Sequence, residues 1–234
     1  MRRDRLLGDR VNIRADDVVC TAHQLNWLPG MSVLERVRQA DHVIWLDRAQ
    51  YVRHSFVNRN RFSDGAWMTV PVDERDTFAP INQVRIADPT GRQREKIARK
   101  LEMLLGPAGA LFAQELRRPY RLLSALNYAL LQHATRALGI EVQQHLQSML
   151  DLRHSVPAVA DDDHDAELVP VRERFAEMAE QLGATVWLTG PSRHFGGEEQ
   201  FLERGIRIET FMWDRPNPCA LEHLRRSSRL EAAA

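Results

Sequence analysis

The sequence has almost no lysine and little cysteine. Lysine occurs only at Lys96 and Lys100, so arginine supplies nearly all of the positive charge. The two cysteines, Cys20 and Cys219, are too few and too far apart for a disulfide framework, and no Cys-x-x-Cys or Cys/His zinc spacing is present. A reducing cytoplasm is therefore the expected location.

An excess of one charge sign and long apolar runs are also missing. The 32 basic residues balance 32 acidic ones, so composition gives no support for binding to nucleic acid or to a membrane surface. No run approaches the length of a membrane span, and the Arg-rich residues 1–10 have no apolar segment behind them long enough for a signal peptide. We therefore expect a small-molecule substrate as the partner, with no nucleic acid and no membrane.

Fingerprints of cofactor and metal sites are absent as well. No Gly-x-Gly-x-x-Gly stretch and no Gly-x-x-x-x-Gly-Lys-Ser/Thr stretch occurs, so the cofactor is left unassigned. Residues 161–165, Asp-Asp-Asp-His-Asp, could hold a hard cation. They lack the Gly and the terminal Glu of a calcium loop, and clustered like charges usually repel one another and stay solvated. We predict a solvated loop there and no metal site.

What the chain does contain is typical of a soluble α/β protein. With 234 residues, 44% of them hydrophobic and 27% charged, it can bury a sizeable core. Short β-branched runs alternate with amphipathic stretches, which predicts a mostly parallel sheet of Rossmann-like type flanked by helices, with a helical segment inserted in the middle. We predict one domain over residues 1–234, with an N-terminal arm (1–16), a mainly helical segment (88–139) and a C-terminal tail (214–234). The tail offers a homodimer contact as one option.

Apolar periodicity and capping signals predict the individual elements. Ser32 is expected to cap the first helix, and Pro119 to begin a helix that ends at Gly139. The expected strands are residues 17–21, 42–47, 67–72, 81–86, 139–142, 184–188 and 206–211. The expected helices are residues 33–37, 93–106, 108–116, 119–138, 171–182 and 198–204.

Residues 46–61, LDRAQYVRHSFVNRNR, are too polar for a core element and are rich in planar donors. Arg guanidinium forks and Asn or Gln amides bind planar anions and amide edges in a fixed geometry. The stretch therefore indicates a site for a phosphate, a carboxylate or a nucleotide sugar. A solvated, salt-bridged turn is the alternative, and these residues alone do not decide between the two. The planar donors of this stretch include Gln50, Arg53, Asn58, Arg59, Asn60 and Arg61.

Polar side chains also stand where predicted strands end. His23 follows the first expected strand and Asp47 is the last residue of the second. Because parallel strands end at the same edge of a sheet, both are expected at the edge where ligands bind. The loop 189–194 follows a later strand and can hold an anion through its backbone amides. Alternatively, His23 only braces the loop or the core. The expected convergence of these polar residues at one sheet edge favours a functional role. We expect His23, Asp47 and Arg59 to be catalytic, and Gln24, Asn26, Gln50, Arg53, Asn58, Asn60, Arg61, Thr189, Gly190, Ser192 and His194 to bind substrate.

These residues resemble the signature of the WbqC-like family. The resemblance runs from about residue 20 to 218 and is densest before Val72. The sequence departs from the family pattern at Leu25, Thr189 and Phe195, where Pro, Ser and Tyr are usual, so position 195 offers no phenolic hydroxyl. The matching motifs are His23-Gln24, Asn26, Leu28-Pro29, Leu46-Asp47, Gln50-Tyr51, Asn58–Arg61, Trp67–Val72 and Trp187–Ser192.

The resemblance implies a place in O-antigen, related sugar or natural-product biosynthesis. With the polar residues above, it predicts a transferase or ligase that forms an amide or ester bond on an activated small molecule, such as a nucleotide-linked amino sugar. His23 would be a general base or a phosphate donor, Asp47 would orient it or a nucleophile, and Arg59 with Arg61 would hold an anionic group.

Two other functions stay open. A non-catalytic ligand-binding partner of a sugar-modifying enzyme could use the same Arg, Asn and Gln side chains. A His after the first strand is also similar to the nucleotidylyltransferase superfamily, although residues 23–30 contain one His and no Gly-His pair.

Overall fold

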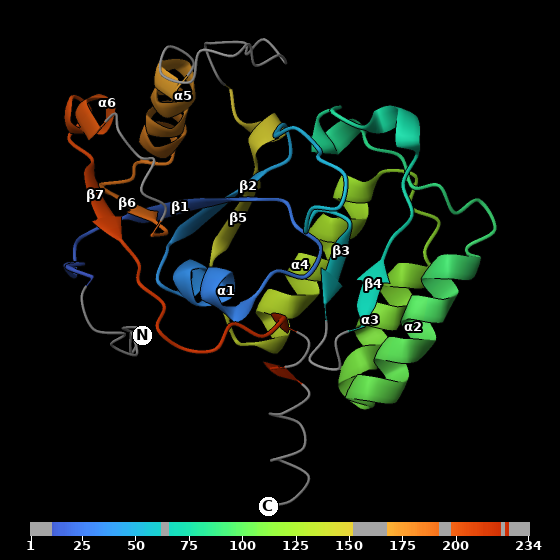
Figure 1. The fold of residues 1–234 in the computed structure, drawn as a ribbon. Coiled ribbons are helices and arrows are strands. Elements are labelled where there is room, and N and C mark those ends of the chain that lie inside the picture. Colours follow the sequence, from blue (N-terminus) through green and yellow to red (C-terminus); the bar gives the residue numbers. More distant parts are fainter. Residues whose placement is uncertain (1–10, 62–65, 152–167, 192–197, 221–222, 225–234) are drawn as a thin grey trace, which may run out of the picture. The chain divides into compact units, whose positions relative to one another are not determined.

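The computed structural model describes residues 11–61, 66–151, 168–191, 198–220 and 223–224 (Figure 1). The chain divides into two compact units. Unit 1 comprises residues 1–23, 35–45 and 142–215, and unit 2 comprises residues 24–34, 46–141 and 216–234. The prediction of a single domain stays a prediction.

Unit 1 is built on a five-stranded parallel sheet with the order β5-β2-β1-β6-β7. Numbered along the chain within this sheet, the order is 3-2-1-4-5, the doubly wound arrangement of Rossmann-type folds. The predicted α/β class with a Rossmann-like sheet is therefore confirmed, and the strand order reverses between β1 and β6. The strands are β1 (Val19–Gln24), β2 (His42–Leu46), β5 (Gln143–Leu146), β6 (Val186–Thr189) and β7 (Arg207–Thr210).

The core of unit 1 follows the two-residue alternation of β6. Trp187 stacks on Phe175 of α5 (Leu168–Gln181), with ring centroids 5.6 Å apart, and lies 5.4 Å from the ring of Phe201 on α6 (Glu198–Leu202). Val186 and Leu188 point to the opposite face and pack with Val19, Ala40 and Phe211. Burying a large apolar side chain stabilises a fold by roughly 1.5–3 kcal/mol, so the side chains on both faces of this strand anchor the sheet.

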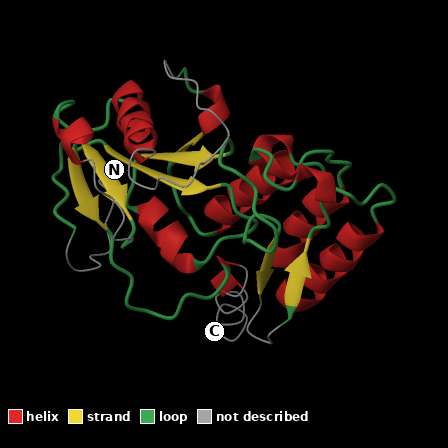
Figure 2. Cartoon of the chain, turned by 45° about the horizontal axis from the view of Figure 1, so that its top comes forward, coloured by secondary structure: helices red, strands yellow, loops and turns green. Residues whose placement is uncertain are grey.

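Unit 2 holds the predicted helical segment. Its helices are α2 (Arg92–Leu105), α3 (Pro107–Arg117) and α4 (Leu123–Ala137), drawn in red in Figure 2. Gly109 lets α3 approach α2 closely, because a Cβ there would lie 2.4 Å from the backbone oxygen of Leu101. The strands β3 (Arg59–Arg61) and β4 (Trp67–Thr69) pair antiparallel in a separate two-stranded sheet.

Three local predictions are wrong. Residues 81–86 form no strand; Ile81–Gln83 is a single 3-10 turn, because Gln83 N–H bonds to Pro80 O and Val84 N–H to Ile81 O. The helix expected from Pro119 begins at Leu123, since the preceding backbone pairs with residue 85 in an isolated bridge. The strand expected at 139–142 lies at 143–146, because Gly139 (φ 61°) and the next residue bond back to the last turn of α4.

The start of α1 (Met31–Arg38) also differs from expectation. Ser32 lies inside the first turn and its N–H donates to Asn217 Oδ1 at 2.8 Å, while Met31 N–H donates to Pro218 O at 2.9 Å. A Cβ on Gly30 would lie 2.5 Å from Asn217 Oδ1, so glycine makes room for this contact. The cap therefore comes from a residue near the end of the chain, which local pattern does not predict.

Within the described ranges, no helix combines the length and the apolar character that crossing a membrane requires. The acidic run 161–165 lies outside the described residues.

Candidate functional site

The reversal of strand order in unit 1 lies between the carboxyl ends of β1 and β6. Val19 pairs with Val186 and Cys20 with Trp187, and this register leaves His23 level with Gly190. The buried Thr21 hydroxyl donates to Leu188 O at 2.6 Å and so holds the two strands together just before they end. In open doubly wound sheets, the crevice beyond this point is where ligands bind.

Three of the predicted site residues lie where β1 and β6 end. His23 is partly exposed at the end of β1. Thr189 is buried, and its backbone oxygen accepts a hydrogen bond from Phe211 N–H at 2.8 Å, so its position is set by the sheet. Gly190 follows at the end of β6 and is partly exposed. The predicted Ser192 and His194 lie outside the described residues.

Arg36 lies beside these strand ends, and the sequence analysis did not single it out. It stands in the part of α1 that belongs to unit 1, and its Nη2 donates to Ala22 O at 3.0 Å. A Cβ on Gly190 would lie 2.8 Å from its Nη1, so the guanidinium reaches from the end of β1 to the end of β6. Its Nε is enclosed and has no hydrogen-bond partner in the part of the chain that the structure describes.

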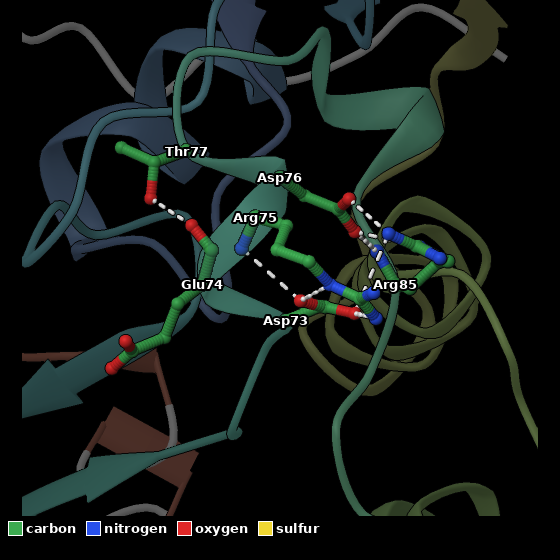
Figure 3. Close-up of polar contacts among 6 residues, drawn as sticks. All are labelled: Asp73, Glu74, Arg75, Asp76, Thr77 and Arg85. Atoms are coloured by element: carbon green, nitrogen blue, oxygen red, sulfur yellow. Dashed lines mark hydrogen bonds and ion pairs between the residues drawn. The ribbon is translucent and has the colours of Figure 1, made fainter.

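Other arginines near carboxylates are neutralised within the fold. Arg85 donates to both carboxylate oxygens of Asp76, at 2.6 and 3.0 Å, and this hydrogen bonding holds the pKa of Asp76 below its usual value (Figure 3). Arg75 is paired with Asp73 in the same way, and the hydrogen bonds lower the pKa of Asp73 (Figure 3). These side chains stabilise the turn around η1 (Glu74–Asp76) and offer no unsatisfied fork for a ligand.

In unit 2, Asp47 is a buried carboxylate directly after β2, and its backbone oxygen accepts from Asn82 N–H at 2.8 Å. Gln24 Nε2 donates to Gln50 O at 3.4 Å, which links two predicted substrate-binding residues. Asn26 has an enclosed side-chain oxygen without a partner in the described ranges. An unsatisfied buried amide oxygen is costly and can accept from a ligand.

Asn58 and Asn60 use their amide donors to brace unit 2. Asn58 Nδ2 donates to Val70 O at 2.9 Å, and Asn60 Nδ2 donates to Trp27 O at 3.5 Å and to Leu28 O. Both side chains are buried. Asn60 Oδ1 also accepts from the backbone N–H of Arg61 at 2.7 Å, so it fixes the chain that presents Arg61.

The arginines of the same stretch have different surroundings. The Arg59 guanidinium lies over the Trp67 ring, 4.2 Å from its centroid, and its Nη1 is 3.4 Å from His54 Nδ1. Phe56 lies 6.2 Å from the Trp67 ring, and both aromatic side chains are about half exposed, at 53% and 45%. We call Phe56, Arg59 and Trp67 the aromatic platform. Arg53 instead forms an exposed ion pair with Glu74.

The structure therefore places His23, Thr189 and Gly190 at the ends of two paired strands in unit 1, and it links Gln24 to Gln50 in unit 2. That all of them converge on one site stays a prediction. No group of three or more His, Cys, Asp or Glu side chains positioned to hold a metal occurs among the residues described.

Comparison with known proteins shows which family the chain resembles. The model of the WbqC-like protein family matches residues 24–218. The chain is 30% identical over 204 residues, 82% of its length and 80% of the relative's, to a Mycobacterium tuberculosis protein named uncharacterized protein Rv1507c. No solved structure matches it significantly.

Proposed function

The chain belongs to the WbqC-like protein family, and we propose that it is an enzyme of sugar, O-antigen or specialised-metabolite biosynthesis. It would be a cytoplasmic transferase or ligase that forms an amide or ester bond on an activated small molecule, such as a nucleotide-linked amino sugar. The observation that carries this proposal is the 3-2-1-4-5 strand order with His23, Thr189 and Gly190 where the order reverses.

The proposed chemistry is attack by an acceptor amine or hydroxyl on an activated acyl carbon. His23 takes the proton of the attacking group, the new C–N or C–O bond forms, and the leaving group departs with the electrons of the bond that breaks. In its neutral form an imidazole can accept this proton near neutral pH. The alternative role of His23 is to donate a hydrogen bond to a phosphate of the donor.

We propose that the polar residues of unit 2 bind the substrate and position its reacting groups. Asp47 would orient the nucleophile or His23, and Arg59 with Arg61 would hold an anionic group of the substrate. Gln24, Asn26 and Gln50 would contact polar substrate edges. Because the amide donors of Asn58 and Asn60 are used within the fold, we propose that they position the neighbouring arginines.

A binding module without catalysis is the second candidate, and the aromatic platform favours it. Phe56 and Trp67 expose two rings close together, and Arg59 lies over one of them. Exposed aromatic faces stack on flat rings, and arginine adds an anion contact. Such a surface suits capture of a nucleotide-linked ligand for a partner enzyme.

A ligand screen followed by a turnover assay tests both candidates. Purified chain is heated with nucleotides, nucleotide sugars, acyl carriers and amino acids, with and without magnesium, and specific ligands are expected to raise Tm. His23→Asn and Arg59→Ala are expected to lose turnover while Tm without ligand changes little. Arg99→Ala is the control, because Arg99 is an exposed residue whose ion pair with Glu95 contributes little. Saturable binding with no turnover of any activated donor would favour the binding module.

A further inference from the structure

The Arg36 side chain is partly buried, its Nε is enclosed, and the described residues bring no opposite charge to it. Burial lowers its pKa to about 10, so it still carries its charge at neutral pH. The described part of the chain places no carboxylate within ion-pair distance of it; nearby Glu35 pairs with Arg38 at 3.0 Å instead. An enclosed charge is costly unless it is paired. A ligand that brings an anion would remove this cost.

Arg94 shows how the same fold treats an arginine that has a structural role. Its side chain is 8% exposed and pairs with Asp88, which is 3% exposed, at 3.5 Å. Arg94 also donates to Arg118 O at 2.6 Å. Both arginines have a buried Nε without a hydrogen-bond partner, but Arg36 has the single hydrogen bond to Ala22 O and no ion pair in the described ranges. The pairing of Arg94 and the lack of pairing at Arg36 separate the two roles.

The helix start that usually holds phosphate in doubly wound folds is filled by the chain itself. In such folds the anion lies at the N-terminus of the first helix. In this protein Asn217 Oδ1 and Pro218 O already accept from the N–H groups of Ser32 and Met31. An anion that enters the crevice between β1 and β6 must therefore find its donors elsewhere.

We propose that Arg36 binds a phosphoryl group of the ligand between the carboxyl ends of β1 and β6. The guanidinium fork matches the paired oxygens of a phosphoryl group, and its contacts with Ala22 O and Gly190 hold it where the two strands end. Gly190 has no Cβ, which leaves the space that Nη1 occupies. This inference rests on the proposed function, which places the ligand at the ends of β1 and β6. It adds that the ligand carries a phosphoryl group at that place.

The first test measures anion affinity of the full chain by calorimetry and by thermal shift. The probes are inorganic pyrophosphate, inorganic phosphate and acetate at matched ionic strength. Pyrophosphate is expected to bind and to raise Tm, with acetate weaker. Arg36→Gln should weaken pyrophosphate binding about tenfold or more, because it loses charge-assisted hydrogen bonds. Arg38→Gln on the same helix is the matched control and should leave affinity unchanged. Equal losses in the two variants, or acetate binding as strongly as pyrophosphate, would overturn the proposal.

Two further variants separate binding from folding. Gly190→Ala keeps the charge but puts a Cβ 2.8 Å from Arg36 Nη1, so it should also weaken pyrophosphate binding. Arg36→Met removes an unpaired enclosed cation, so Tm without ligand should stay equal or rise. If Arg36→Met has a lower Tm and Gly190→Ala binds pyrophosphate as tightly as the wild type, Arg36 has a structural role. That result would contradict the proposed phosphoryl-binding role of Arg36.

Failure of the Arg36 proposal and failure of the proposed enzymatic function give different results. Loss of pyrophosphate binding in Arg36→Gln, with no activated donor ever turned over by the wild type, supports the anion site and rejects the enzyme. Turnover by the wild type with unaltered pyrophosphate affinity in Arg36→Gln rejects the anion site and supports the enzyme.

Discussion

Asn217 Oδ1 accepts a hydrogen bond from the backbone N–H of Ser32 at 2.8 Å, so a residue close to the end of the chain caps the helix that follows β1. Pro218 O accepts from Met31 N–H, and Ala220 N–H donates to Pro29 O, so residues 217–220 run along the start of α1. The first turn of this helix therefore depends on a segment far away in sequence.

Replacing the cap should destabilise the protein measurably. Asn217→Ala leaves the N–H of Ser32 without its acceptor, and loss of an Asn cap costs about 1 kcal/mol of unfolding free energy. The measurement is the urea midpoint by circular dichroism. Asn217→Asp is the matched control: a carboxylate can accept the same hydrogen bond and is favoured at a helix N-terminus, so its midpoint should stay near that of the wild type.

A double-mutant cycle with Gly30 tests the same contact. Gly30→Ala places a Cβ 2.5 Å from Asn217 Oδ1 and should displace the cap. In the Asn217→Ala background that clash is absent, so the same change should cost less. Equal costs in both backgrounds would show that the contact carries no stability.

The pair His42 and His145 should make stability depend on pH. His42 Nδ1 lies 3.1 Å from His145 Nε2 across the neighbouring strands β2 and β5. Burial lowers the pKa of His42, while nearby Asp41 opposes this shift; burial and then the charge of His42 lower the pKa of His145. Both folded-state pKa values lie below the usual 6.5. Between the folded-state and the unfolded-state pKa values, the unfolded chain therefore binds more protons than the folded chain.

The stability of this pair is therefore fully present above about pH 6.5 and is lost as pH falls toward the folded-state pKa values. We expect the urea midpoint to drop between about pH 7 and pH 5, and to drop less in His145→Gln, which cannot become a second imidazolium. If the urea midpoint of His145→Gln depends on pH as strongly as that of the wild type, the pH dependence does not come from this histidine pair.

Much of the fold follows from local pattern. Gly139, Gly183 and Gly205 all have positive φ and lie just past α4, α5 and α6, where a glycine permits the left-handed turn that ends a helix. The strand predicted at residues 81–86 fails because its backbone groups bond within local turns, which apolar alternation does not reveal.

The candidate site was less predictable, for physical reasons. Asn58 and Asn60 belong to a polar stretch that reads as a binding surface, yet both are buried and donate to backbone oxygens. From the sequence pattern alone, Arg36 would be interpreted as a solvent-exposed residue of an amphipathic helix. Its enclosure depends on the ends of β1 and β6, which are far apart in sequence, and only their pairing reveals it.

The buried ion pair of Asp88 and Arg94 gives the sharpest stability prediction. Asp88→Asn removes the carboxylate that neutralises a nearly buried guanidinium, and breaking such a pair costs about 3–5 kcal/mol. Asp88 Oδ2 also accepts from Arg94 N–H at 2.9 Å, and the side-chain oxygen of the Asp88→Asn variant can still accept this hydrogen bond, so the loss reports mainly the ion pair. The unfolding free energy from urea titration measures the loss.

Two variants complete this test. Arg99→Gln breaks an exposed ion pair on the same helix and should change the free energy of unfolding by less than about 1 kcal/mol. The double change Asp88→Asn with Arg94→Met removes both charges, so it should recover a large share of the stability lost by Asp88→Asn alone. If the double variant is no more stable than Asp88→Asn, the cost comes from altered contacts of the side chain at position 88, and the uncompensated charge of Arg94 contributes little.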